Sequence, residues 1–202
     1  MKNQVPAQQE GGSLDATAKV QFNSIESAKE FYEIAKLRLL NVSGWAEICK
    51  VPLSTFILCD EKGNEVNRLA ITGDLLKIDI PGPGPTSGEG YDWVKIEKIT
   101  EDVTGDISIT SLQARPAANP LNEDPAVAHF FTEQATSTFQ VKLIGSIVTA
   151  EEHGRNEVPN TDTSHLADNI RNTLIGWSAR IGLSFPQWKS LVKGIVETEP
   201  TQ

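Results

Sequence analysis

Two alternating stretches joined by a two-residue turn constrain the fold of this chain more than any other feature. Residues Thr138–Ile144 and Ile147–His153 alternate apolar with polar side chains, and only Gly145-Ser146 separates them. A two-residue loop with Gly first favours a tight type II′ hairpin, whose register follows from the turn. That register places Phe139 opposite Glu152, and the side-chain period of two then sorts the residues by face. One face of the predicted hairpin carries Phe139, Val141, Leu143, Val148, Ala150 and Glu152.

The rest of the chain shows two hydrophobic periods, one near 3.6 residues and one of two residues. The helical period predicts a helix from Ile25 to Asn41, a short piece at Trp45–Cys49, and two helices after the hairpin, Leu166–Ile181 and Ser184–Ile195. The period of two predicts further strands on both sides of the first helix. These strands are Ala16–Phe22, Ser54–Asp60, Glu65–Ile71, Leu75–Ile80, Trp93–Ile99 and a run over 107–112.

This order predicts an α+β fold: a curved antiparallel sheet of six to seven strands, with N-terminal and C-terminal helices packed on one face. A small β-barrel with flanking helices has the same strand count and is the alternative. We expect a single domain over residues 16–198, because residues 1–15 are polar and aperiodic and predict a disordered tail. Asp124-Pro125 has the residue types of a helix start, and predicts a short helix in the insert before the hairpin.

The order of elements resembles the helix-grip fold of the START and Bet v 1-like lipid-binding proteins over about Ala16–Val196. In that family too, a first strand leads into two short helices, an antiparallel sheet and a long C-terminal helix. The chain departs from this order where its terminal helical pattern breaks at Gly182–Pro186, and in the insert Asn119–Phe131. The resemblance implies an apolar ligand, and we expect its cavity between the 139–152 hairpin and the Leu166–Ile181 helix.

Charge and cysteine content limit the partners and the compartment. The 18 Lys and Arg residues face 27 Asp and Glu residues, a net charge of −9, whereas nucleic acids and anionic membranes need a basic face. No apolar run has the length of a membrane span, and the first residues do not read as a secretory signal. Cys49 and Cys59 are too few for a disulfide framework, and their pairing stays open. We expect a reduced, cytoplasmic protein.

The stretch Glu151–Glu157 is the densest cluster of reactive side chains. Glu152 falls on the apolar face beside Phe139, where burial would raise its pKa and suit it to acid/base catalysis or to holding a polar ligand group. His153 falls on the opposite face, so the two residues do not form a simple adjacent dyad. The alternative is a strand that frays after Ala150 and leaves the whole cluster in solvent.

Tryptophans supply the other candidates for ligand contact. Trp45, Trp177 and Trp188 fall on apolar helix stripes, and Trp93 opens a strand. Indoles can line a pocket for a flat or apolar ligand, or they can fill the interface between helices and sheet. We expect a ligand site formed by Glu152, Phe139, Val141, Trp177 and Trp93.

No motif in the sequence specifies an activity. The three histidines match no metal-ligand spacing, so we expect neither a metal nor a cofactor. The Gly- and Pro-rich stretch Pro81–Gly90 leads into a strand and not a helix, which excludes a phosphate loop. A binding protein for a small apolar or amphipathic ligand is the first hypothesis, and an enzyme using Glu152 or His153 in the same cavity is the second. The third is a protein-interaction module that presents Pro81–Gly90 and Phe130-Phe131.

Overall fold

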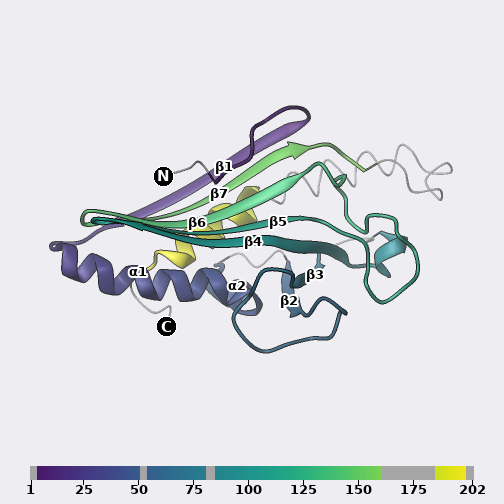
Figure 1. The fold of residues 1–202 in the computed structure, drawn as a ribbon, viewed down its shortest axis with the longest axis horizontal. Helices are drawn as coiled ribbons and strands as arrows, with labels where there is room; N and C mark the ends of the chain where they lie inside the picture. Colours follow the sequence, from purple (N-terminus) through teal and green to yellow (C-terminus); the bar gives the residue numbers. More distant parts are fainter. Residues whose placement is uncertain (1–3, 51–53, 81–84, 161–184, 199–202) are drawn as a thin grey trace.

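The computed structural model describes residues 4–50, 54–80, 85–160 and 185–198. These residues form a seven-stranded antiparallel sheet in the order β1-β7-β6-β5-β4-β3-β2, with helices on one face (Figure 1). The strands are β1 (Gly12–Gln21), β2 (Thr55–Cys59), β3 (Leu75–Asp79), β4 (Asp92–Thr104), β5 (Ile107–Pro116), β6 (Thr136–Ile144) and β7 (Ile147–Glu157). The helices are α1 (Ile25–Leu40), η1 (Val42–Gly44), α2 (Trp45–Ile48) and η2 (Thr86–Gly88), and residues 185–195 are also helical.

The predicted α+β class is confirmed, and the barrel alternative is wrong. β1 and β2 form the two edges of the sheet in the described part of the chain, so the sheet stays open. A first strand, two helices, an antiparallel sheet and a terminal helix follow one another as in the helix-grip order. No helix among the described residues combines the length and the apolar composition needed to cross a lipid bilayer.

The hairpin of β6 and β7 has the predicted register. Phe139 pairs with Glu152 and Leu143 with Val148, and Gly145 supplies the positive φ, 59°, that the first turn position requires. β7 continues to Glu157, so the alternative in which the strand frays after Ala150 is wrong. Its continuation has a physical cause, because β7 lies between β6 and β1 and makes ladder bonds on both sides.

Helix α1 and the terminal helix of residues 185–195 pack on one face of the sheet, here called the inner face (Figure 1). α1 starts at Ser24, whose side chain accepts a hydrogen bond from the Ser27 N–H at 3.1 Å. Arg38 of α1 donates to the last carbonyls of the terminal helix, including that of Ile195 at 3.0 Å, and so joins the two helices. Their shared core with the sheet includes Phe31, Leu39, Val42, Phe139, Val141, Leu191, Val192 and Ile195.

The expected strand Glu65–Ile71 is a loop. β2 pairs directly with β3, and only an isolated bridge from Cys59 to Glu65 remains of the expected hairpin. The buried carboxylate of Asp74 organises this loop, because it accepts from the Arg68 guanidinium at 2.6 Å and from the Ile71 N–H at 2.9 Å. A contact between the side chain and the loop backbone thus replaces the strand ladder that the alternation predicted.

Three further expectations from the sequence concern the start of β1 and two predicted helices. β1 begins at Gly12, so residues 12–15, which we expected in a disordered tail, pair with β7. No helix starts at Asp124-Pro125, because the Asp124 carboxylate accepts from the Ala126 N–H at 2.9 Å in a turn. The expected helix Leu166–Ile181 lies outside the described residues.

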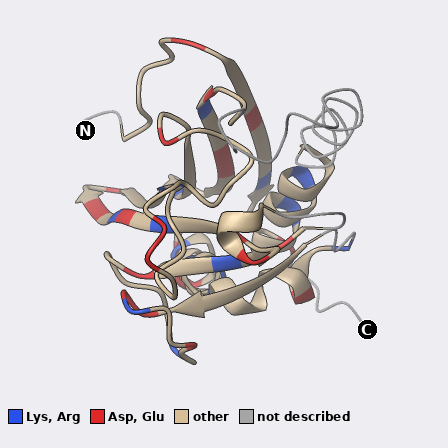
Figure 2. Cartoon of the chain, turned by 90° about the vertical axis from the view of Figure 1, so that its right-hand side faces the viewer, with Lys and Arg blue, Asp and Glu red and all other residues tan. Residues whose placement is uncertain are grey.

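Charged residues are distributed on both sides of the sheet. Figure 2 shows acidic and basic residues interspersed along the described strands, loops and helices rather than gathered by sign.

The face opposite to the inner face, here called the outer face, has a small apolar cluster near β2, β3 and β4. It contains Cys59, Leu75, Trp93 and Ala128.

Candidate ligand cavity

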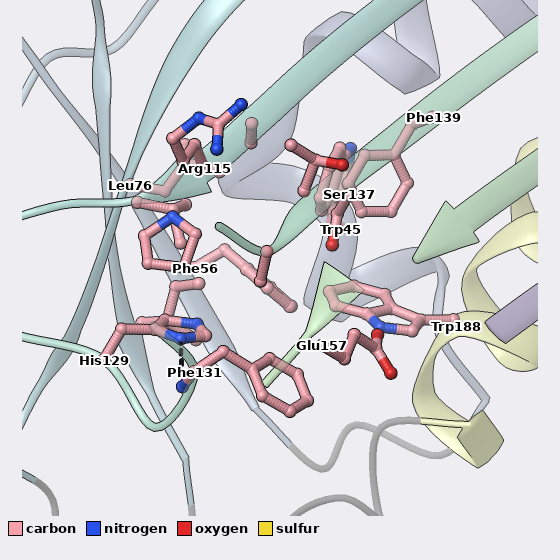
Figure 3. A pocket seen from close by; sticks show the side chains of 16 residues that line it. Trp45, Phe56, Leu76, Arg115, His129, Phe131, Ser137, Phe139, Glu157 and Trp188 are labelled. Atoms are coloured by element: carbon pink, nitrogen blue, oxygen red, sulfur yellow. Dashed lines mark hydrogen bonds between the residues drawn. The ribbon is translucent and has the colours of Figure 1, made fainter. Parts of the chain in front are cut away.

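A cavity lies at the end of the inner face, where β2, β3, β6 and β7 meet residues 129–135 and the terminal helix (Figure 3). It has two adjoining hollows. The first hollow extends to Trp45 and Phe139, and the second extends to Ser54, Ile80 and Gln187. The side chains that line both are Phe56, Ile78, His129, Phe131, Ser137, Glu157 and Trp188.

The size of the cavity suits a single ring better than a long lipid chain. The space that can take the centre of a water molecule is about 50 Å³ in the first hollow and 60 Å³ in the second. At roughly 10–15 Å³ per water, each hollow takes about three to six waters, on the order of 90–180 Å³ of liquid. An apolar void of about 150 Å³ is large enough to bind benzene.

Four aromatic rings form a connected wall. The Phe139 ring lies 4.8 Å from that of Trp45 and 5.1 Å from that of Trp188, measured between centroids. Phe56 closes the group at 5.4 Å from Trp45 and 6.0 Å from Trp188. The indole N–H of Trp45 donates to the Leu39 carbonyl at 3.1 Å, which fixes the orientation of its ring. Rings held in this way give the cavity a preformed apolar surface.

His129 and Phe131 face the cavity from the irregular segment before β6. Nδ1 of His129 accepts the Phe131 N–H at 2.9 Å, so the other ring nitrogen carries the proton when the imidazole is neutral. The His129 ring also stacks on Phe130 at 4.4 Å. Both His129 and Phe131 are buried, whereas the sequence suggested a short helix in this segment. Burial of Phe131 also removes it from the exposed surface that the protein-interaction hypothesis requires.

A bulge in β7 turns Glu157 toward the cavity. Between Leu14 and Gly12 of β1, the pairing passes from Gly154 to Glu157, so β7 contains one extra residue. Asn156 has a φ of 56°, a left-handed conformation that Asn tolerates better than most residues. The extra residue puts Glu157 on the same face as Glu152 and Gly154 instead of on the outer face.

Gly154 leaves room for the Glu157 carboxylate. A Cβ at position 154 would lie 3.1 Å from Cδ of Glu157 and closer still to one of its carboxylate oxygens. Burial raises the pKa of Glu157 above its ordinary value, and the charge on Arg155 lowers it in part. Arg155 is held on the other side of the strand, where it donates to the Leu14 carbonyl at 3.1 Å and to Asp15 at 2.8 Å.

Glu152 lies on the inner face, as the hairpin register predicts, and its side chain has no exposed surface. Within the described part of the chain, neither carboxyl oxygen has a hydrogen-bond partner. Burial raises the pKa of Glu152 well above its ordinary value, and the charges of Glu157 and Asp15 raise it further. Glu152 is paired with Phe139 but does not itself line either hollow.

Arg115 lines the first hollow, but its guanidinium is bound elsewhere. Its Nε donates to the Glu97 carboxylate at 2.7 Å, and one of its terminal nitrogens donates to the Glu133 carbonyl at 2.5 Å. Both partners belong to exposed residues. Among the described groups, the carboxylate of Glu157 is therefore the charge that the cavity wall offers to a ligand.

His153 lies on the outer face, as predicted, and does not reach the cavity. Its two ring nitrogens are hydrogen-bonded to the carboxylates of Glu151, at 2.8 Å, and of Asp15. The hydrogen bond to Glu151 is the main reason why the pKa of His153 is raised. The structure therefore does not bring Glu152 and His153 together. The described residues also contain no group of three or more His, Cys, Asp or Glu side chains arranged for a metal.

The remaining predicted ligand residues have different positions. Phe139 lines the first hollow, and Val141, two residues further along β6, is fully buried in the core. Trp93 lies in the outer-face cluster, away from the cavity lining, because it pairs with Lys77 on that side of β3. Trp177 lies outside the described residues.

Sequence reasoning missed His129, Phe131 and Glu157 as residues of one cavity. The signal for Glu157 was local, since Gly154 and Asn156 are residue types common at bulges. The signal for the other two was absent, because their position depends on how the insert folds over the sheet end. Trp188 was expected on the apolar stripe of the last helix, and this stripe places it in the cavity wall.

Comparisons with known proteins identify no family. No family model matches the chain, and no curated protein matches it. Among solved structures, the chain is similar to the hypothetical protein jhp0584 from Helicobacter pylori, with 10% identity, 95% of this chain and 98% of that chain covered, and a TM-score of 0.46. It is also similar to the Zhui aromatase/cyclase from Streptomyces sp. R1128, with 11% identity, coverage of 91% and 93%, and a TM-score of 0.39. A third similar structure, Ara h 8.0201, has 14% identity, coverage of 92% and 99%, and a TM-score of 0.33.

Proposed function

We propose that this chain binds a small apolar or amphipathic molecule in the cavity at the end of its inner face. The observation that carries the proposal is the connected wall of Trp45, Phe56, Phe139 and Trp188, which borders space that no described residue fills and, among the described residues, meets a single carboxylate, that of Glu157. Such a combination of aromatic walls with few polar groups is typical of ligand pockets. The two cysteines, which are free and buried, support the further proposal of a reducing, cytoplasmic setting.

Filling the cavity tests the proposal directly. We expect benzyl alcohol, a neutral single-ring probe, to change the tryptophan fluorescence of the wild-type protein in a saturable way. Ser137→Leu adds bulk to a residue that lines both hollows, and should abolish this change. Thr149→Leu is the matched control, because Thr149 pairs with Lys142 on the outer face and the same substitution there leaves the cavity intact. Equal binding by both variants would contradict the proposal.

An enzyme is the second candidate, and the raised pKa values of two inner-face carboxyl groups favour it. Burial raises the pKa of both Glu152 and Glu157, and a carboxyl group with a raised pKa keeps its proton to a higher pH than an ordinary carboxyl group, as a general acid requires. His153 has no part in this candidate, because it faces away from the cavity. A Glu152→Gln or Glu157→Gln variant that folds and keeps a detected activity would remove that residue from the acid/base role. Native mass spectrometry of protein purified gently from its host would report any retained ligand and the number of subunits.

A further inference from the structure

Among the described Asp, Glu, Lys and Arg residues, Glu157 and Arg115 line the cavity, and only Arg115 has its charge bound by other described groups. Glu157 of β7 lines both hollows and is half-buried. Arg115 of β5 is bound by Glu97 and the Glu133 carbonyl, and Arg155 is bound to Asp15 beyond the strand. None of the described residues donates a hydrogen bond to the Glu157 carboxylate, so none of them uses its acceptor capacity.

A second carboxyl group, that of Glu152, lies on the same face of β7 as Glu157. Glu152 has the same orientation on β7, has no exposed surface and lacks a hydrogen-bond partner among the described residues. Its interaction with Glu157 is repulsive when both are charged. A cation near Glu157 would relieve this repulsion, whereas an anion would add a third negative group to the same face.

The aromatic wall favours the same sign of charge. The faces of Trp and Phe rings carry negative electrostatic potential, so they attract a cation placed over them. Trp188 and Phe56 line both hollows together with Glu157, and Figure 3 shows Trp188 and Glu157 on the same side of the cavity. An ammonium group at this place would contact rings and carboxylate at once.

We propose that the ligand is a protonated amine carried on a small apolar body, with its ammonium group bound by Glu157 and its apolar part against the rings of Phe56, Phe139 and Trp188. This inference rests on the proposed ligand binding and names the chemical class of the ligand. Gly154 is a positioning residue for it, because its missing side chain leaves the space in which the Glu157 carboxylate lies.

Three probes of nearly equal shape test the sign of the charge. Benzylammonium, benzyl alcohol and benzoate carry one ring with a cationic, neutral or anionic group, and their dissociation constants can be measured by tryptophan fluorescence at neutral pH. We expect benzylammonium to bind about ten-fold more tightly than benzyl alcohol, a difference of ~1.4 kcal/mol, and benzoate to bind most weakly. Benzyl alcohol or benzoate binding as tightly as benzylammonium would overturn the charge preference and leave ligand binding standing. Binding of none of the three would overturn both proposals.

Variants assign the preference to one carboxylate. Glu157→Gln keeps the shape of the side chain, and should reduce the advantage of benzylammonium about ten-fold while benzyl alcohol still binds. Gly154→Ala keeps the charge but displaces it, and should reduce the advantage in part. Glu151→Gln is the matched control, because Glu151 is bound to Lys142 and His153 on the outer face. A full preference in the folded Glu157→Gln variant, or an equal loss in Glu151→Gln, would contradict the assignment.

Discussion

Glu151 and Glu152 are neighbours on β7, but they lie on opposite faces of the strand, and their pKa values are shifted in opposite directions. On the outer face, Glu151 accepts from Lys142 at 2.6 Å and is bound to His153 at 2.8 Å. The hydrogen bond from His153 is the main reason why the pKa of Glu151 is lowered. On the inner face, Glu152 is fully buried without a partner among the described residues, and burial raises its pKa.

We expect the charged groups of the outer face to contribute to stability and those of the inner face to contribute to ligand binding. The outer-face charges stabilise the folded chain modestly, because each has a partner and water screens them in part. The inner-face carboxyl group of Glu152 costs stability, since no hydrogen bond from a described residue offsets its desolvation. A buried carboxyl group that no described residue hydrogen-bonds, beside an aromatic cavity, is the arrangement expected at a site that binds a ligand or catalyses a reaction.

The largest expected effect is the loss of packing on the inner face. Phe139→Ala should lower the free energy of unfolding by about 3–5 kcal/mol, because the ring is buried against Trp45 and Trp188. Thr149→Ala truncates a side chain on the outer face of the same hairpin, and should lower the free energy of unfolding by only about 0–1 kcal/mol. Urea denaturation measures both. Losses of equal size would mean that the two faces are not different in packing.

A smaller effect of opposite sign comes from the two glutamates. Glu152→Met replaces a buried carboxyl that has no partner in the described part of the chain with an apolar side chain of similar length, and should raise the free energy of unfolding by about 1–3 kcal/mol at pH 7. Glu151→Met leaves Lys142 and His153 without their shared partner, and should lower it by about 0.5–1 kcal/mol. A destabilised Glu152→Met protein would show that the carboxyl has a stabilising contact.

The smallest effect is the pH dependence of these differences. The folded-state pKa of Glu152 lies above its ordinary value of 4.5, so its protonated form stabilises the fold fully below that pH and less as pH rises through the folded pKa. Glu152→Gln should therefore gain stability over the wild type as pH rises above 4.5. The pKa of Glu151 is lowered, so Glu151→Gln should lose stability relative to the wild type above pH 4.5, and this loss should disappear as pH falls. Thermal unfolding across this pH range compares them, and slopes of the same sign would contradict the opposition of the two faces.

Much of the local structure could be predicted from residue patterns. The turn at Gly145 and the alternation beyond it predicted the pairing of Phe139 with Glu152 and the opposite orientation of His153. The strand expected at 65–71 was wrong, because alternation alone does not reveal that Asp74 binds Arg68 and holds a loop. The length of β7 was also uncertain from the sequence, since it depends on β1 as a second partner.

Local periodicity by itself determined the class of fold, the register of the last hairpin and the face on which Glu152 lies, because a side chain's direction along a strand follows from its position relative to the turn. Only the tertiary structure decided that Glu152 has no hydrogen-bond partner among the residues that the structure describes, and that Glu157 turns inward beside Trp188. It also decided that His129 and Phe131 complete the cavity wall. Those outcomes depend on contacts between segments far apart in the chain, and no spacing of residues along one segment specifies which groups of another will approach it.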